Sequence, residues 1–160
     1  IVHRIKIKAL AIFALFAGLA SCDSTRVYED YHSVGSNGWH MDSVQTFSVS
    51  SEDSIQSYDG FLGLRLNESY PYQNLFVFIE QVYPNGDSRF DTVNYRVAGS
   101  RGELLGDGIG AIKEYQLPLW LDGTFPGSGE YTIFITQAMR DTQLVGVEDV
   151  GFRLALHRDK

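Results

Sequence analysis

The sequence predicts an all-β protein, a single β-sandwich domain of jelly-roll or immunoglobulin-like type that follows a secretory signal. Seven or eight short runs alternate apolar with polar side chains, Gly- and Asn-rich turns separate them, and no window of a dozen residues has a convincing helical period. Regularly spaced short strands with turn signals are typical of sandwiches and barrels. A lipocalin-like barrel is the alternative, but one-sided apolar strands and connections of unequal length favour two packed sheets.

The chain begins with the organisation of a signal peptide, which we place at residues 1–21. Arg4, Lys6 and Lys8 form a basic start without acidic residues, and an apolar run of 11 residues follows. A membrane-spanning helix needs about 20 apolar residues, so this run is too short for a stable anchor. The run leads into Leu-Ala-Ser before Cys22, which looks like a lipobox. A plain signal peptide with a chance cysteine, or a buried N-terminal helix, explains the order of these features less well.

Cys22 is the only cysteine of the chain, so no disulfide can stabilise the mature domain. We predict that its thiol carries diacylglycerol and that palmitate-like acyl chains hold the protein on a membrane. Stable anchoring needs more than one acyl chain, and a bacterial lipoprotein typically has three. Apart from this covalent lipid, the sequence predicts no cofactor.

Residues 22–41 are polar with scattered aromatics, and we interpret them as the lipidated N-terminus and a short tether. Tyr28, Tyr31 and Trp39 suggest that the second half of this stretch packs on the domain. The β-sandwich itself is expected to occupy residues 42–160. Its predicted strands are 44–50, 60–67, 74–83, 89–98, 104–105, 109–119, 130–138 and 149–157.

The apolar pattern of these strands predicts which side chains point inward. Leu62, Leu64 and Leu66 share one face of their strand, as do Tyr131, Ile133 and Ile135 of another. Residues 74–83 begin apolar on both faces, which predicts a central strand covered on both sides. The Pro-Asn-Gly-Asp sequence at 84–87 predicts a hairpin turn, and residues 118–122 have the weak pattern of a single helical turn.

Charge excludes some classes of partner. Without the signal peptide, ten basic and twenty acidic residues remain, a formal net charge of −10. Such a domain is poorly suited to nucleic acid or to electrostatic docking on anionic lipid. The aromatic content of 13% and the four prolines argue against a disordered chain.

No pattern of catalytic or metal-binding residues emerges. The Gly-x-Ser-x-Gly elbow of hydrolases is missing, and His32 and His40 lack the spacing of a zinc site. Residues 106–110 read Gly-x-Gly-x-Gly and lead into a predicted strand, so they indicate a turn and not a dinucleotide loop. We therefore predict no metal site and no enzyme.

Several large aromatics lie at or near predicted loops: Tyr70, Tyr72, Trp120 and Phe125. Exposed aromatics can stack on sugar rings or anchor a protein partner. The commoner role of such residues is to close the ends of a sandwich core. Together with Arg140, they are the candidate contacts for a partner or a glycan.

An ordered set of short patterns follows the lipobox-like segment. It comprises Tyr70-Pro71-Tyr72-x-Asn74-Leu75-Phe76-x-Phe78, Pro84-x-Gly86, Asp91-Thr92, Gly102, Leu105-Gly106-x-Gly108-x-Gly110, Gln137-x-Met139-Arg140, Leu144-x-Gly146-Val147 and Val150-Gly151. In this order the set resembles the GldH family of gliding-motility lipoproteins from Bacteroidetes. The resemblance spans about residues 70–153, and the order of the elements, rather than any one element, carries it.

This resemblance implies a membrane-anchored, non-enzymatic lipoprotein of the cell envelope that is required for gliding motility. It implies an adaptor or structural role in the motility and type IX secretion machinery, with other envelope proteins as partners and no nucleic acid. The family has no established catalytic residues to carry over. The lipid would place the domain on the periplasmic side of a membrane or at the cell surface. The alternative is a carbohydrate-binding envelope lipoprotein.

Overall fold

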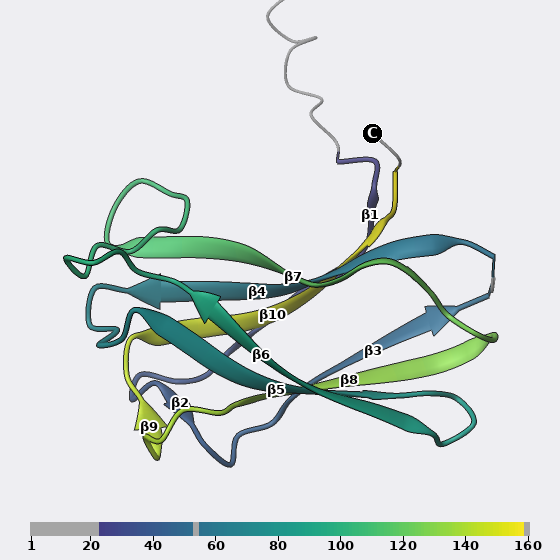
Figure 1. Cartoon of the computed structure of the whole chain (residues 1–160), viewed down its shortest axis with the longest axis horizontal. Coiled ribbons are helices and arrows are strands. Elements are labelled where there is room, and N and C mark those ends of the chain that lie inside the picture. Colours follow the sequence, from purple (N-terminus) through teal and green to yellow (C-terminus); the bar gives the residue numbers. More distant parts are fainter. Residues whose placement is uncertain (1–22, 53–54, 159–160) are drawn as a thin grey trace, which may run out of the picture.

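The computed structural model describes residues 23–52 and 55–158, and every regular element in this part of the chain is a β-strand (Figure 1). The strands are β1 (Arg26–Ser33), β2 (Trp39–His40), β3 (Gln45–Ser51), β4 (Ser57–Asn67), β5 (Asn74–Val82), β6 (Ser88–Arg96), β7 (Ile112–Thr124), β8 (Gly129–Gln137), β9 (Gln143–Leu144) and β10 (Val147–Leu156). The predicted all-β class is confirmed. Among the described residues, none forms a helix long and apolar enough to cross a membrane.

Two four-stranded sheets form the layers of an open sandwich (Figure 1). Sheet 1 has the order β1-β10-β4-β7, and sheet 2 has the order β3-β8-β5-β6. All neighbouring strands are antiparallel. The short strands β2 and β9 pair with each other at one end.

The core lies between the inner faces of the two sheets. The inward residues of β8 were predicted correctly, since Tyr131, Ile133 and Ile135 are fully buried. They lie in the same core as Leu62, Leu64 and Leu66 of β4, Val150, Phe152 and Leu154 of β10, and Phe47 and Val49 of β3. The period-2 pattern located these side chains because each strand has one inner face.

Residues 26–40 belong to the folded domain, so the packing predicted for the second half of the tether holds and extends into its first half. β1 pairs with β10 along most of its length, and Tyr28 packs 6.1 Å from the ring of Phe152. Trp39 is fully buried, and its indole Nε1 donates a hydrogen bond to the carbonyl of Ser43 at 2.8 Å. β1 resembles a tether in sequence because it is an edge strand with many exposed polar side chains. Cys22 and the signal peptide lie outside the described residues.

Two further predictions are wrong, the first of them at β7, the other edge strand of sheet 1. Residues 118–122 are extended, not helical. Pro118 is compatible with a strand there because an edge strand leaves half of its N–H groups unpaired. The ring of Trp120 lies over Gly60, where a Cβ would come within 2.4 Å of the indole, and the register of β4 shifts at that glycine. Residues 104–105 are not a strand, and only a single bridge joins Leu104 to Ala98.

Candidate functional site

Polar interactions cover the outer face of sheet 1. Tyr31 lies flat across this face, over Gly63 and Gly151, whose missing side chains leave room for its ring. The guanidinium of Arg65 sits 4.4 Å from the centre of that ring and also pairs with Asp149 at 3.2 Å. Because the Tyr31 ring, the Arg65 guanidinium and the Asp149 carboxylate bind one another, this face offers little apolar surface to a partner.

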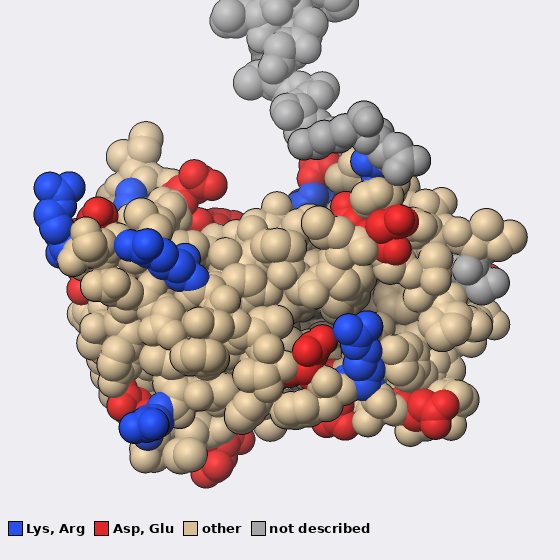
Figure 2. Space-filling model, in the orientation of Figure 1, with Lys and Arg blue, Asp and Glu red and all other residues tan. Residues whose placement is uncertain are grey.

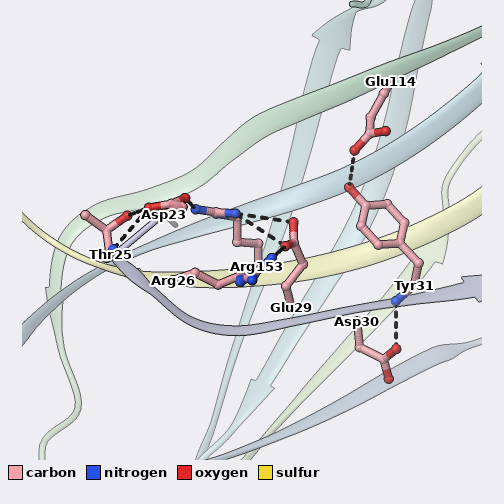
Figure 3. A network of polar contacts seen from close by, with 8 residues as sticks. All are labelled: Asp23, Thr25, Arg26, Glu29, Asp30, Tyr31, Glu114 and Arg153. Atoms are coloured by element: carbon pink, nitrogen blue, oxygen red, sulfur yellow. Dashed lines mark hydrogen bonds and ion pairs between the residues drawn. The ribbon is translucent and has the colours of Figure 1, made fainter. Parts of the chain in front are cut away.

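One end of this face is fastened by Asp23 (Figure 3). The Asp23 carboxylate accepts hydrogen bonds from the hydroxyl of Thr25 at 2.6 Å and from its amide at 3.0 Å. It also pairs with Arg153 of β10, whose guanidinium lies 3.4 Å from Glu29 of β1. The hydrogen bonds from Thr25, with the contribution of Arg153, hold the pKa of Asp23 well below its usual value.

The outer face of sheet 2 is different, because phenylalanine side chains lie on it. Phe78 of β5 and Phe90 of β6 are 40% and 61% exposed, and their ring centres are 5.5 Å apart. Phe76 lies two residues before Phe78 on β5 and is 38% exposed. Phe134 lies next to Phe78 and Phe90, on the neighbouring strand β8. We call these four residues the phenylalanine face. The prediction that both faces of β5 are covered is therefore wrong for this chain: Leu75, Val77 and Ile79 are buried on the inner face alone.

Around these rings the surface is mostly hydroxyl-bearing. Thr46, Thr92 and Thr136 stand on neighbouring strands at the same level as Phe78 and Phe134. Glu80 is opposite Phe90 on one side and opposite Phe134 on the other. The phenylalanine face therefore combines aromatic rings and hydroxyls around one carboxylate.

Two of the predicted contact residues lie beside the phenylalanine face. Tyr72 and Arg140 line a shallow pocket together with Phe76 and Met139. The hydroxyl of Tyr72 donates to Asp141 at 2.8 Å, and the sulfur of Met139 accepts from the amide of Phe76 at 3.3 Å. The structure thus brings these loop residues next to strand residues that sequence reasoning did not select.

A second concave site opens at the edge where β6 and β7 face each other. It is a cleft of about 200 Å³ lined by Trp120, Tyr83, Gln81 and the ion pair between Arg89 and Asp91. The side of the molecule drawn in Figure 2 is mostly uncharged, with charges mainly near its outline and one red and blue group close to a hollow. Aromatic rings beside polar groups are the chemistry that binds sugars, so the carbohydrate-binding alternative would use this cleft.

Tyr95 of β6 makes a hydrogen bond between the two sheets, and its burial there predicts a pH dependence of stability. Its hydroxyl donates to the carbonyl of Pro118 at 2.6 Å. Burial, assisted by the Asp91 carboxylate, raises the pKa of Tyr95 to about 12 from an ordinary 10.0. Because the pKa is higher in the folded state, the protonated phenol contributes its full stabilisation below pH 10. This stabilisation is lost as the pH rises towards 12.

We expect Tyr95→Phe to lower the free energy of unfolding by about 0.5–1.5 kcal/mol below pH 10, the net worth of a hydrogen bond. Between pH 10 and pH 12 this advantage of the wild type should shrink and disappear, because the phenol ionises near pH 10 in the unfolded chain but only near pH 12 in the folded protein. Urea unfolding of both proteins across this pH range is the measurement. A difference between them that persists undiminished near pH 12 would contradict the assignment.

The part of this chain that matches known proteins includes nearly the whole sandwich. The family model described as GldH lipoprotein matches residues 26–154. The gliding motility lipoprotein GldH of Flavobacterium johnsoniae is 40% identical over 158 residues, which cover 94% of this chain and 97% of that protein. The GldH homolog of Christiangramia forsetii is 39% identical over 142 residues, covering 84% and 86%.

The chain belongs to the GldH lipoprotein family. The resemblance noted in the sequence is thereby confirmed, and with it the prediction of a gliding-motility lipoprotein. The family match begins at β1, in the stretch that sequence reasoning assigned to the tether. Among solved structures, the VP2 subviral particle of infectious bursal disease virus overlaps with a TM-score of 0.33 and 16% identity, covering 88% of this chain and 37% of that chain. That likeness is too weak to support an argument.

The remaining predicted contact residues of this GldH-family chain are not free on the surface. Tyr70 is 7% exposed and its hydroxyl donates to the carbonyl of Asn74 at 2.8 Å. Phe125 is 3% exposed, and its ring centre lies 4.3 Å from that of Tyr131. Both residues pack in the core, although Phe125 also lines the cleft, where Trp120 is only partly buried.

No cluster of three or more His, Cys, Asp or Glu side chains placed to hold a metal occurs within residues 23–52 and 55–158. His32 stacks on the ring of Phe47 at 4.5 Å, and His40 has Asp42 3.8 Å away. Sequence reasoning missed Phe78 and Phe90, although the apolar outer positions of β5 were a visible signal of an unusual face.

Proposed function

We propose that this GldH-family lipoprotein is a non-enzymatic adaptor of the gliding-motility and type IX secretion machinery. Its family places it in the cell envelope, anchored to a membrane, and is not a family of enzymes. The adaptor would hold an envelope protein of that machinery on its phenylalanine face while acyl chains on Cys22 keep it at the membrane.

The exposed phenylalanine face is the observation that carries this proposal. Three phenylalanines at 38–61% exposure on adjacent strands are unusual for a surface that meets only water. Aromatic anchors surrounded by uncharged polar groups are typical of the centre of a protein interface, from which charged residues are depleted. The neighbouring Tyr72 and Arg140 are residue types enriched at such interfaces.

The partner that fits is a protein surface with apolar side chains at its centre and a basic group for Glu80. Glu80 stands between Phe90 and Phe134 in the register of sheet 2, so a partner that covers both rings also covers this carboxylate. Leaving a covered carboxylate unpaired would cost several kcal/mol, which is why the partner should supply a positive charge there.

The experiment that tests the proposal is a clean deletion, complemented with wild type or with Cys22→Ser. We expect the deletion to abolish colony spreading, wild type to restore it and the unlipidated variant not to restore it. Protein in the culture fluid, measured in the same strains, shows whether secretion is lost together with spreading. Purified membranes, crosslinked and probed for co-isolated motility and secretion proteins, test the adaptor role directly.

Two results would overturn this function. One is normal spreading and secretion in the deletion strain, and the other is a crosslinked membrane fraction that never contains a motility or secretion protein. Either result would favour the alternative, in which the protein binds a carbohydrate in the cleft. In that case a bound sugar should quench Trp120, while the fully buried Trp39 should not respond.

A further inference from the structure

The first described residues are held firmly on the domain. Besides the pairing of Asp23 with Arg153, the amide of Leu156 donates to the carbonyl of Thr25 at 2.8 Å. The guanidinium of Arg158 donates to the hydroxyl of Ser24 at 2.9 Å. Every residue from Asp23 to Arg26 therefore has a hydrogen bond or an ion pair of its own.

The attachment point for the lipid is one residue away. Consecutive Cα atoms are about 3.8 Å apart, so a lipid on the residue that precedes Asp23 would be attached one residue from this fastened position. A flexible tether of twenty residues would instead span roughly 25 Å. Acyl chains on Cys22 would bring this end of the sandwich to the level of the lipid headgroups.

This end belongs to sheet 1. Arg153 points outward from β10, between the inward-facing Phe152 and Leu154, and pairs in register with Glu29 of β1. In Figure 1 the start of β1 and the end of β10 rise together on the side of sheet 1, away from sheet 2. The Arg153 guanidinium is occupied by Asp23 and Glu29, whereas the exposed guanidiniums of Arg26 and Arg158 also lie at this end, and guanidinium groups bind phosphate well.

We infer that the β1–β10 end of sheet 1 rests against phospholipid headgroups, and that the clamp between Asp23 and Arg153 holds the sandwich with its phenylalanine face turned away from the membrane. The fastening of Asp23 sets the orientation, and the exposed Arg26 and Arg158 contact the headgroup phosphates. Net acidity keeps the rest of the domain off an anionic surface. This inference rests on the lipidation of Cys22 assumed in the proposed function, but not on the adaptor role.

The test uses the full lipoprotein in vesicles of phosphatidylethanolamine and phosphatidylglycerol that carry a headgroup-linked nitroxide quencher. Since Cys22 is the only native cysteine, a fluorophore on an introduced cysteine reports one position. The two positions are Val27→Cys in β1, where the native side chain is 49% exposed, and Thr92→Cys beside Phe78 on the outer face of sheet 2. We expect most of the fluorescence to be lost at position 27 and little to be lost at position 92.

Two variants test the clamp. Ten Gly and Ser residues inserted between Cys22 and Asp23 should bring the quenching at position 27 down towards that at position 92. Arg153→Gln should have the same effect in part, whereas the matched control Arg89→Gln, in an exposed ion pair of β6, should have none. Thermal unfolding of each variant verifies that the domain remains folded.

Equal quenching at the two positions in the wild-type background would overturn the inference, as would an insertion that leaves quenching unchanged. Mass spectrometry of the N-terminal peptide measures lipidation separately. An unmodified Cys22 would overturn both this inference and the anchored form of the proposed function. A lipidated protein with equal quenching would overturn the orientation alone.

Discussion

A chain that starts at Asp42, and so lacks β1 and β2, is expected not to fold. Such a chain would leave β10 without one of its two neighbours and expose the inner side of Phe152 next to the missing Tyr28. It would also lose Trp39, the largest of the fully buried side chains. Replacing a buried tryptophan with alanine costs about 3–5 kcal/mol, and a domain is stable by only about 5–15 kcal/mol.

The measurement is the near-ultraviolet circular dichroism and thermal unfolding of the mature domain and of the shortened chain. Trp39→Ala in the intact domain separates the contribution of the indole from that of β1, and it should remain folded with a lowered midpoint. Val27→Ala, at an exposed position of β1, serves as the control and should change the free energy of unfolding by less than about 0.5 kcal/mol. A cooperative unfolding transition in the shortened chain would contradict this prediction and show that the domain folds without residues 23–41.

Substituting the phenylalanine face should abolish function without harming the fold. In Phe78→Ser with Phe90→Ser, both exposed rings are removed, and the loss of their cross-strand contact should lower the free energy of unfolding by about 1 kcal/mol or less. An interface aromatic worth about 2 kcal/mol contributes roughly 30-fold in affinity. We therefore expect crosslinking to the partner and colony spreading both to be lost, with only a small decrease in the unfolding midpoint.

Ile109→Ser is the matched control, because Ile109 is apolar and fully exposed but lies outside the strands of sheet 2. This variant should spread like wild type. If the double phenylalanine variant spreads normally at wild-type abundance, the phenylalanine face is not the docking surface. If the variant is depleted from membranes, its abundance must be restored by expression before the two strains are compared.

The alternating strands could be predicted because each of them presents one side to the core. β8 is the clear case, because its buried residues Tyr131, Ile133 and Ile135 alternate with residues that are only half-buried. β1 could not be predicted in the same way, since its partner β10 lies at the other end of the sequence and its own side chains are mostly polar. Pairing over so long a separation leaves no local signal.

The candidate site was less predictable than the fold. Tyr70 and Tyr72 stand two residues apart in one loop, yet one is buried in the core and the other is exposed beside Phe76. The direction of a loop side chain depends on what it packs against, and the chain itself has no period there. In β5 the outer phenylalanines were visible, but apolar residues on both faces normally mean that both faces are covered within the domain.

The pairing of β1 with β10 has a consequence for export. Arg26 lies opposite Ala155, so the first strand of the domain finds its partner only after nearly all of the chain is available. β10 also joins β1 to β4, and sheet 1 stays incomplete until this last strand arrives. Such non-local sheets form slowly compared with local ones. A newly made chain of this topology would therefore stay extended long enough to be threaded through a translocon, because its sandwich closes only once β10 is available.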